Sequence, residues 1–274
     1  MDKIAIISGG GKLPLTIGKT LLKKNYDVCF IILKGFTDIN SYKNYKHHEI
    51  SITSFKEILN FLKKNKIDKI IMAGKINRPT ISEIKFDLTT LSLIKSYYLE
   101  SKGDNQLLTT ISNLFLKNGF PLFDWILHCP ELFLNKDFIT KTKPNRNSHL
   151  NMLKGLETFS IIGNADIGQS LVIQNKIILG IEAAEGTDEL LKRCHNYKKK
   201  GDKGLLLKLS KYKQSTILDL PTIGIKTIKN IFNYEYEGIY IEKNKCIILD
   251  KDEVIEFCND KKIFIATVNK IENI

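Results

Sequence analysis

The sequence lacks several features that define large classes of protein. No apolar run approaches the ~20 residues that a membrane-spanning helix needs, which argues against an integral membrane protein. The apolar run near the N-terminus is too short for a signal peptide and ends in glycines rather than at a cleavage site. The sequence therefore predicts a cytoplasmic protein. Its 274 residues, 43% of them hydrophobic, suffice for one large domain or two of ordinary size.

Cysteines are few, odd in number and without CxxC spacing. They are Cys29, Cys129, Cys194, Cys246 and Cys258. Both a disulfide framework and a zinc site usually show closely spaced cysteines, so this pattern favours neither. We expect five buried, free thiols, as is common in a reducing compartment.

Arginine is also scarce, because only three of the 42 basic residues are arginines: Arg78, Arg146 and Arg193. With 30 acidic residues the net charge is +12, which favours anionic partners such as phospholipid or a phosphorylated substrate. The abundance of Lys, Ile and Asn throughout also allows a compositional bias as the source of part of this charge. No RNA-binding motif is present, so we expect no nucleic-acid partner. An arginine retained in so lysine-rich a chain indicates a need for its planar guanidinium.

The first half alternates short apolar runs with amphipathic stretches. Strands are expected at residues 4–8, 28–33 and 69–73, and helices at residues 13–24, 55–65 and 104–118. Alternating strands and helices with short turns predict a Rossmann-like parallel sheet.

The second half has a different pattern. A polar stretch at residues 135–148 is interpreted as the linker or its edge. Beyond it, strands at 170–174 and 177–182 form a predicted hairpin, and further strands and helices follow to residue 268. The predicted fold is α/β, with a Rossmann-like domain at 1–134 and a catalytic α/β domain with a mixed sheet at 135–274.

A glycine-rich turn follows the first expected strand. Gly9, Gly10 and Gly11 precede Lys12, Leu13 and the first expected helix. Glycines in this position let backbone N–H groups approach a phosphate, although a purely structural turn explains them equally well. The turn matches neither the Walker A pattern nor GxGxxG.

Two later loops carry similar phosphate-binding candidates. Gly74 and Arg78 follow the strand at residues 69–73, and ligands of open α/β sheets bind at such strand ends. Lys102 and Gly103 precede a helix whose N-cap could be Asp104. A solvated loop arginine and a simple helix cap are the alternatives.

Acidic residues gather around the predicted hairpin. Asp166, Gly168 and Gln169 precede it, and a second group follows it: Glu182, Glu185, Gly186, Thr187, Asp188 and Arg193. A carboxylate at a strand end can bind a metal or a substrate, whereas Thr187 and Asp188 could simply cap a helix.

One further carboxylate lies in an apolar setting. Asp219 stands between Leu218 and Leu220, where an unpaired charge is expensive. A divalent cation would be a suitable partner. The alternative is an aspartate that makes turn hydrogen bonds ahead of Pro221.

These stretches, in this order, resemble the UDP-2,3-diacylglucosamine pyrophosphatases of the type that is not a metallophosphoesterase. The similarity covers nearly the whole chain. It is most specific in three segments: Asp166, Ile167, Gly168 and Gln169; Glu182 and residues 185–188 with Arg193; and Asp219 through Gly224.

The resemblance implies cleavage of UDP-2,3-diacylglucosamine to UMP and 2,3-diacylglucosamine 1-phosphate (lipid X), in lipid A biosynthesis. It implies Mg²⁺ or another divalent cation as cofactor and Asp219 as the catalytic aspartate, and we expect Asp219 and Asp188 to bind the metal. The expected substrate-binding residues are Gly10, Gly11, Lys12, Leu13, Gly74, Arg78, Lys102, Gly103, Gln169, Thr187 and Arg193. An acylated substrate and a basic surface further predict peripheral contact with the anionic inner membrane.

The sequence departs from the family pattern at three positions. Ser215 and Ile217 replace an aspartate and an arginine before Asp219, and Asn105 replaces an aspartate after Asp104. Altered metal affinity or substrate preference would follow, and a non-catalytic nucleotide-sugar or lipid-binding protein is the alternative function. A dinucleotide-dependent oxidoreductase fits less well, because GxGxxG is absent and Lys34 stands where a ribose-binding acid is expected.

Overall fold

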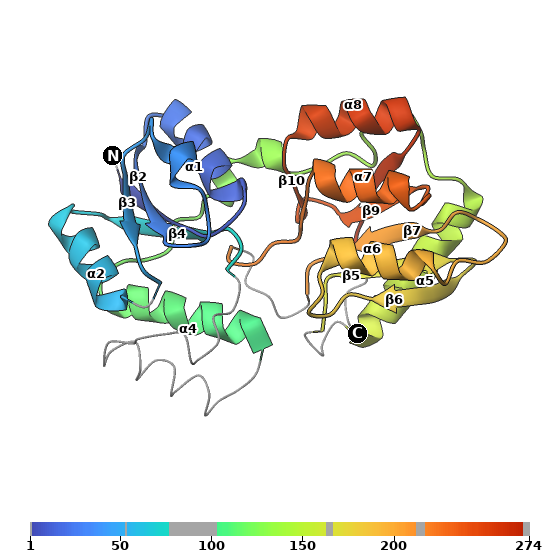
Figure 1. The fold of residues 1–274 in the computed structure, drawn as a ribbon, viewed down its shortest axis with the longest axis horizontal. Helices are drawn as coiled ribbons and strands as arrows, with labels where there is room; N and C mark the ends of the chain where they lie inside the picture. The colour runs from blue at the N-terminus through green and yellow to red at the C-terminus, as the bar shows by residue number, and fades with distance from the viewer. Residues whose placement is uncertain (1, 53, 77–102, 163–166, 212–216, 271–274) are drawn as a thin grey trace. The chain divides into compact units, whose positions relative to one another are not determined.

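The computed structural model describes residues 2–52, 54–76, 103–162, 167–211 and 217–270. The chain divides into two compact units, Met1–Pro130 and Glu131–Ile274, each with its own sheet and core (Figure 1). The division falls four residues before the boundary expected from the sequence.

The first unit contains a parallel sheet of order β3-β2-β1-β4. The strands are β1 (Lys3–Ser8), β2 (Asp27–Leu33), β3 (His47–Ile50) and β4 (Lys69–Ala73). Strands β1, β2 and β4 confirm the three strands expected from the sequence. The fourth, β3, is a short edge strand whose polar sequence gave no apolar signal. The strand order reverses between β1 and β4, which are direct neighbours.

Helices cover both faces of this sheet. Helix α1 (Leu13–Lys23) packs on one face, where Gly18 lies against the ring of Phe30. Helices α2 (Phe55–Lys64) and α4 (Gly103–Lys117) share a hydrophobic cluster with the other face. Short 3₁₀ helices complete the connections: η1 (Ile39–Tyr42), η3 (Ile126–His128) and η4 (Pro130–Leu132).

The second unit contains a mixed sheet of order β11-β9-β7-β5-β6. Its strands are β5 (Ser170–Gln174), β6 (Ile177–Ile181), β7 (Leu205–Lys208), β9 (Gly238–Glu242) and β11 (Phe264–Val268). Strands β7, β9 and β11 are parallel, and β5 runs antiparallel to both β7 and β6. Consequently β6, β7, β9 and β11 end, and β5 begins, at one edge of the sheet, hereafter the carboxyl edge.

The predicted hairpin and mixed sheet are confirmed. Asn175 and Lys176 join β5 to β6 with φ angles of 52° and 63°, the left-handed backbone that a two-residue hairpin turn requires. A separate parallel pair is formed by β8 (Thr222–Ile223) and β10 (Ile247–Ile248).

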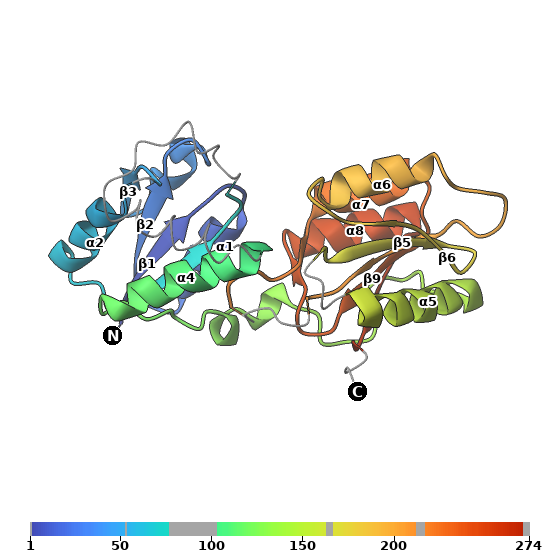
Figure 2. The same cartoon turned by 90° about the horizontal axis from the view of Figure 1, so that it is seen from below.

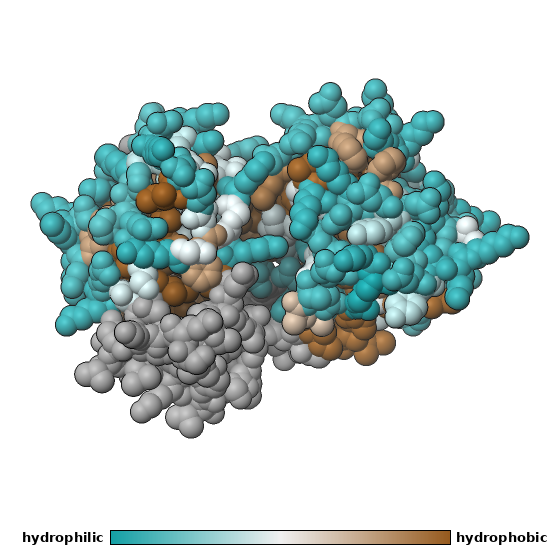
Figure 3. Space-filling model, in the orientation of Figure 1, coloured by the Kyte–Doolittle hydropathy of each residue, from teal (hydrophilic) through white to brown (hydrophobic). Residues whose placement is uncertain are grey.

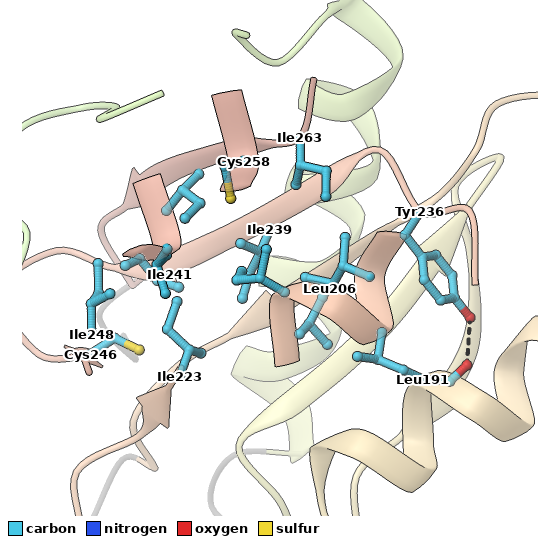
Figure 4. Packing of buried hydrophobic residues seen from close by; sticks show 14 of the residues in the cluster. Leu191, Leu206, Ile223, Tyr236, Ile239, Ile241, Cys246, Ile248, Cys258 and Ile263 are labelled. Atoms are coloured by element: carbon cyan, nitrogen blue, oxygen red, sulfur yellow. Dashed lines mark hydrogen bonds between the residues drawn. The ribbon is translucent and has the colours of Figure 1, made fainter. Parts of the chain in front are cut away.

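Helices lie on both faces of the second sheet as well. Helix α5 (Arg146–Ile162) covers one face, and α6 (Thr187–His195), α7 (Ile225–Asn233) and α8 (Lys251–Lys261) cover the other (Figures 1 and 2). Figure 4 shows the core on the three-helix side, where Leu206 and Ile239 of the sheet meet the helices. There the hydroxyl of Tyr236 donates to the carbonyl oxygen of Leu191 at 3.0 Å.

The interpretation of residues 135–148 as a linker is wrong. Phe138 forms a bridge with Ala266 of β11, and the amide of Ile265 donates to Thr140 Oγ1 at 3.0 Å. The polar side chains that suggested a linker instead provide hydrogen bonds along the edge of a sheet. Arg146, at the end of this stretch, is the first residue of α5.

The five cysteines are buried and free, as expected. Within the described ranges, none of the helices combines the length and apolar character needed to cross a bilayer.

Candidate functional site

Loops after β1 and β4 meet at the carboxyl ends of these strands. The amide of Gly9 donates to the carbonyl of Ala73 at 2.8 Å, and Gly10 and Lys75 exchange two backbone hydrogen bonds of 2.7 and 2.8 Å. Ligands of open α/β sheets bind where the strand order reverses, and this is that point of the first unit.

The glycines of these loops are required by close backbone packing. A Cβ on Gly9 would lie 2.7 Å from the Lys75 carbonyl oxygen, and one on Gly10 would lie 2.7 Å from that of Phe36. Gly74 has a φ of 94° and would place a Cβ 2.7 Å from the Gly9 backbone. These contacts support the interpretation of the glycines as residues of a tight structural turn. The N–H group of Gly10 already donates to the Lys75 carbonyl rather than to a ligand.

The start of α1 retains the features of an anion-binding end. Gly11 has a φ of 89°, and Lys12 precedes the first helical residue, Leu13. The side chain of Lys12, the N-cap residue, does not cap this end of the helix. N–H groups of a first helical turn attract phosphate, so Gly11, Lys12 and Leu13 remain candidate phosphate-binding residues.

Several expected site residues lie outside the described residues. They are Arg78, Lys102, Asp166 and Ser215. Gly103, in contrast, lies within the described residues as the first residue of α4.

Four polar residues form a network at the carboxyl edge of the second unit. The Lys208 ammonium lies 2.7 Å from Thr187 Oγ1, 3.1 Å from Ser170 Oγ and 3.7 Å from Glu182 Oε2. The Thr187 hydroxyl donates to Glu182 Oε1 at 3.0 Å. The network therefore joins the end of β7 to the start of β5, the residue after β6 and the start of α6.

This network is enclosed by the protein. The side chain of Lys208 is 5% exposed and that of Glu182 is 13% exposed. The buried Glu182 Oε2 has no hydrogen-bond partner in the described part of the chain, so its compensation comes from the ammonium charge of Lys208. Glu182 and Thr187 were candidates from the sequence, but Lys208 was not. The only sequence feature that marks Lys208 is its position directly after three leucines of a predicted strand.

A second buried carboxylate lies at the end of β9. Glu242 Oε2 accepts the amide and the hydroxyl of Ser210 at 2.8 and 2.7 Å, and Glu242 Oε1 pairs with Lys245 at 3.0 Å. Lys270 donates to the Ser210 carbonyl at 2.7 Å. Burial lowers the pKa of Lys270, and the nearby Glu242 charge offsets only part of that shift. The sequence analysis missed this cluster, although Glu242 also ends an apolar run.

Asp219 is brought to the same edge by its backbone. Gln169 Nε2 donates to the Asp219 carbonyl at 3.3 Å, while the Gln169 carbonyl accepts the Leu209 amide at 2.8 Å. Asp219 is half-buried. Gly168 allows this arrangement, because a Cβ there would lie 1.9 Å from the Glu182 carbonyl oxygen. The structure thus gathers Gln169, Glu182 and Asp219 around one sheet edge.

Arg193 has partners within its own unit. Its guanidinium donates to Glu185 Oε1 at 3.0 and 2.8 Å and to the Ile181 carbonyl at 2.7 Å. Burial alone would raise the pKa of Glu185, but its backbone hydrogen bond and the Arg193 contact outweigh that effect and lower it. Arg193 therefore holds the loop between β6 and α6, and this contact gives it a structural role besides any substrate contact.

Family models match both units. The LpxI N-terminal domain model matches residues 3–132 and the LpxI C-terminal domain model matches residues 135–266. The chain belongs to the LpxI family. The resemblance stated from the sequence is thereby confirmed.

A curated LpxI relative spans the same length. It is the UDP-2,3-diacylglucosamine pyrophosphatase LpxI of Caulobacter vibrioides (strain ATCC 19089 / CIP 103742 / CB 15), 29% identical over 279 residues and covering 99% of each chain. Among solved structures, the UDP-Glc/GlcNAc 4-epimerase from Campylobacter jejuni covers 100% of this chain and 88% of its own. It shares 13% identity with a TM-score of 0.34, too slight a likeness to inform fold or function.

The expected metal can be compared with the donors present. No group of three or more His, Cys, Asp or Glu side chains suited to a metal occurs in the described ranges. Asp188 pairs with Lys226 at 2.9 Å and accepts from Thr227 at 3.3 Å, so both of its oxygens already have partners. Mg²⁺ commonly uses one or two carboxylates with substrate phosphates and water. Asp188, with both oxygens engaged, fits that mode poorly.

Proposed function

We propose that this protein hydrolyses UDP-2,3-diacylglucosamine at its pyrophosphate, releasing UMP and 2,3-diacylglucosamine 1-phosphate. The observation that carries the proposal is the match of both units to LpxI models, with a relative of that activity aligned over 99% of the chain. The carboxyl edge supports it, since the half-buried Asp219 lies there beside the amide of Gln169.

The proposed chemistry places Asp219 at the reacting phosphate. Cleavage of a phosphoric anhydride requires an oriented water and stabilisation of charge on the phosphoryl oxygens. The Asp219 carboxylate would orient the water or bind the cation, and the Gln169 contact fixes the backbone from which it extends. Thr187 and Gln169 remain candidates for substrate contact at this edge, and Gly11, Lys12 and Leu13 remain candidates in the first unit.

We also propose that the reaction uses Mg²⁺ or another divalent cation. When bound, such an ion would neutralise charge that develops on the phosphate oxygens. By the family resemblance, Asp219 is the residue expected to hold it, together with oxygens of the substrate and water.

A UMP-release assay tests the proposal directly. Purified protein, UDP-2,3-diacylglucosamine and Mg²⁺ should yield equal amounts of UMP and the lipid 1-phosphate by mass spectrometry. Excess EDTA should abolish release, and added Mg²⁺ should restore it. UMP release that persists in EDTA would contradict the proposed metal requirement but not the proposed hydrolysis. No UMP above the enzyme-free rate, across several acyl lengths and divalent metals, would reject the function itself.

A further inference from the structure

The positively charged side chain of a buried lysine lies among oxygen atoms at the carboxyl edge. Lys208 approaches three oxygen-bearing side chains, Ser170, Glu182 and Thr187, at 3.1, 3.7 and 2.7 Å. An ammonium has three N–H donors, and removal of either partner of a buried lysine–carboxylate pair leaves an uncompensated buried charge. These three side chains are therefore arranged around an internal cation that belongs to the chain.

The lysine is connected to Asp219 by a short series of contacts. Lys208 Nζ contacts Ser170, the residue after Gln169. Leu209, the residue after Lys208, donates its amide to the Gln169 carbonyl at 2.8 Å. The Gln169 side chain in turn donates to the Asp219 carbonyl at 3.3 Å. The end of β7 thus contacts the carbonyl of Gln169 and the residue that follows it, and Gln169 contacts the turn that carries Asp219.

We propose that Lys208 is a positioning residue for the pyrophosphate-cleaving site, acting through Ser170 and Gln169 on the Asp219 turn. The inference rests on the proposed function for its catalytic consequence. The side chain of Lys208 is enclosed by protein. Its ammonium holds Glu182 and Thr187 in the same way as it holds Ser170, so the start of α6 and the loop after β6 share the same support.

The first variant is Lys208→Met, which keeps much of the side chain's volume and removes its charge. Displacement of a catalytic group by about 1 Å can lower a rate by about 10²-fold. We expect kcat to fall on that order while KM changes by less than about 3-fold, because the interaction that is lost acts on the transition state. Melting temperature should also fall, because Glu182 is left buried without a countercharge.

The double variant Lys208→Met with Glu182→Gln separates positioning from stability. Removing both charges leaves no buried unpaired carboxylate, so the melting temperature should recover towards the wild-type value. The kcat should stay low, because nothing replaces the ammonium that holds Ser170 and Thr187. Recovery of kcat together with melting temperature would show a role in stability alone and overturn the inference.

A matched control is Lys198→Met in the same unit. Lys198 is a partly buried lysine whose ammonium donates to the carbonyls of Tyr234 and Glu235, next to the start of β9 and therefore at the opposite edge of the sheet. Its loss should change stability but leave kcat within about 3-fold of wild type.

Hydrogen exchange provides a measurement that does not depend on activity. In the double variant, amides of residues 183–187 and 217–220 should exchange faster than in wild type, while those of β9 and β11 should not. Unchanged exchange at 217–220 would overturn the inference even if wild type released no UMP. A wild type without UMP release, combined with faster exchange at 217–220, would reject the proposed function and leave the positioning role of Lys208 intact. If Lys208→Met does not fold, Ser170→Ala removes one oxygen that Lys208 Nζ contacts, and unchanged kcat together with unchanged exchange at 217–220 would overturn the inference.

Discussion

Asp219 and Asp188 are two aspartates of the same unit with very different surroundings. Asp188 is held by Lys226 and Thr227, whereas Asp219 extends from a half-buried turn at the carboxyl edge. The sequence alone suggested that both bind metal. Asp188 already has a cationic partner in Lys226, so it would gain less from binding a metal ion, and the family resemblance points to Asp219 rather than Asp188 as the catalytic aspartate.

This difference predicts unequal effects of removing each carboxylate. Asp219→Asn should lower turnover by about 10²–10⁴-fold, the range for loss of a general acid–base group. Asp188→Asn should lower turnover by less than about 10-fold, because it removes only a pair with an exposed lysine. Turnover and melting temperature of both variants check this. Near-normal turnover in Asp219→Asn would identify that aspartate as a turn residue and move attention to Asp166, Glu182 and Glu185.

Glu237 is a partly buried carboxylate away from the candidate site. Burial raises its pKa, and its contacts with the side chains of Ser148 and Asn145 offset only part of that shift. Its Oε1 is buried and, among the described residues, has no hydrogen-bond partner.

Glu237→Gln should therefore stabilise the protein at neutral pH. Ionised Glu237 costs more in the folded than in the unfolded chain, so the gain should be largest above its folded pKa. It should disappear as pH falls below the unfolded value, where both states are protonated. A gain of about 1 kcal/mol is expected, the usual cost of an unsatisfied buried oxygen. Urea unfolding at several pH values measures it, and a gain independent of pH would contradict the explanation.

Glycine determines how closely the elements at the carboxyl edge approach. Gly168 lies directly under the backbone of Glu182, whereas Gly224, before α7, has an extended φ of −153° and would place a Cβ no nearer than 3.7 Å to Leu249. The two glycines therefore differ in what an added methyl group would meet.

Gly168→Ala should destabilise the protein by about 1–3 kcal/mol or more and lower turnover, because the Glu182 backbone must move away. Gly224→Ala should cost less than about 1 kcal/mol, from a poorer helix cap. Thermal melts and UMP release compare the two. Equal effects would show that the contact between Gly168 and Glu182 is not required.

Most elements were predictable because apolar runs and turn residues marked them. Apart from β3, the strands of both sheets followed this pattern, and the Asn175 and Lys176 turn was identified correctly. Helix α5 was not predicted, because its buried face includes Ser148 and Asn151. Asn151 accepts the Lys176 amide at 2.7 Å. A polar residue buried by such a distant hydrogen bond disrupts the apolar periodicity on which helix prediction depends.

The candidate site was predictable to a similar extent. Gln169, Glu182, Thr187 and Asp219 came from the family resemblance, and the structure brings them to one edge. Lys208 and Glu242 could not be found, because Lys208 contacts Thr187, 21 residues away in the chain, and Glu242 contacts Ser210, 32 residues away. In a sequence so rich in lysine, a single buried lysine leaves no compositional signal.

At the scale of the whole molecule, charge is the dominant property. The net charge is +12, and Figure 3 shows hydrophilic side chains over most of the visible face. We propose that this surface favours anionic lipid, from which an acylated substrate would be drawn.

Binding to vesicles should therefore depend on salt. Retention on vesicles of anionic lipid should exceed retention on zwitterionic ones at about 0.1 M ionic strength. The difference should be lost near 1 M, where the Debye length falls from about 10 Å to about 3 Å. Co-sedimentation measures this. Equal retention on both lipids at low salt would show that the charge does not direct the protein to membranes.

The five buried thiols make the native chain resistant to alkylation. Burial raises the pKa of Cys246 and of Cys258 to about 12, so almost no thiolate is present at neutral pH. Cys29 and Cys129 belong to the first unit and the other three to the second. Iodoacetamide should leave the folded protein unmodified, and denaturant should expose two and three sites in the respective units. Mass spectrometry of the modified peptides would then report the opening of each unit separately, without any engineered label.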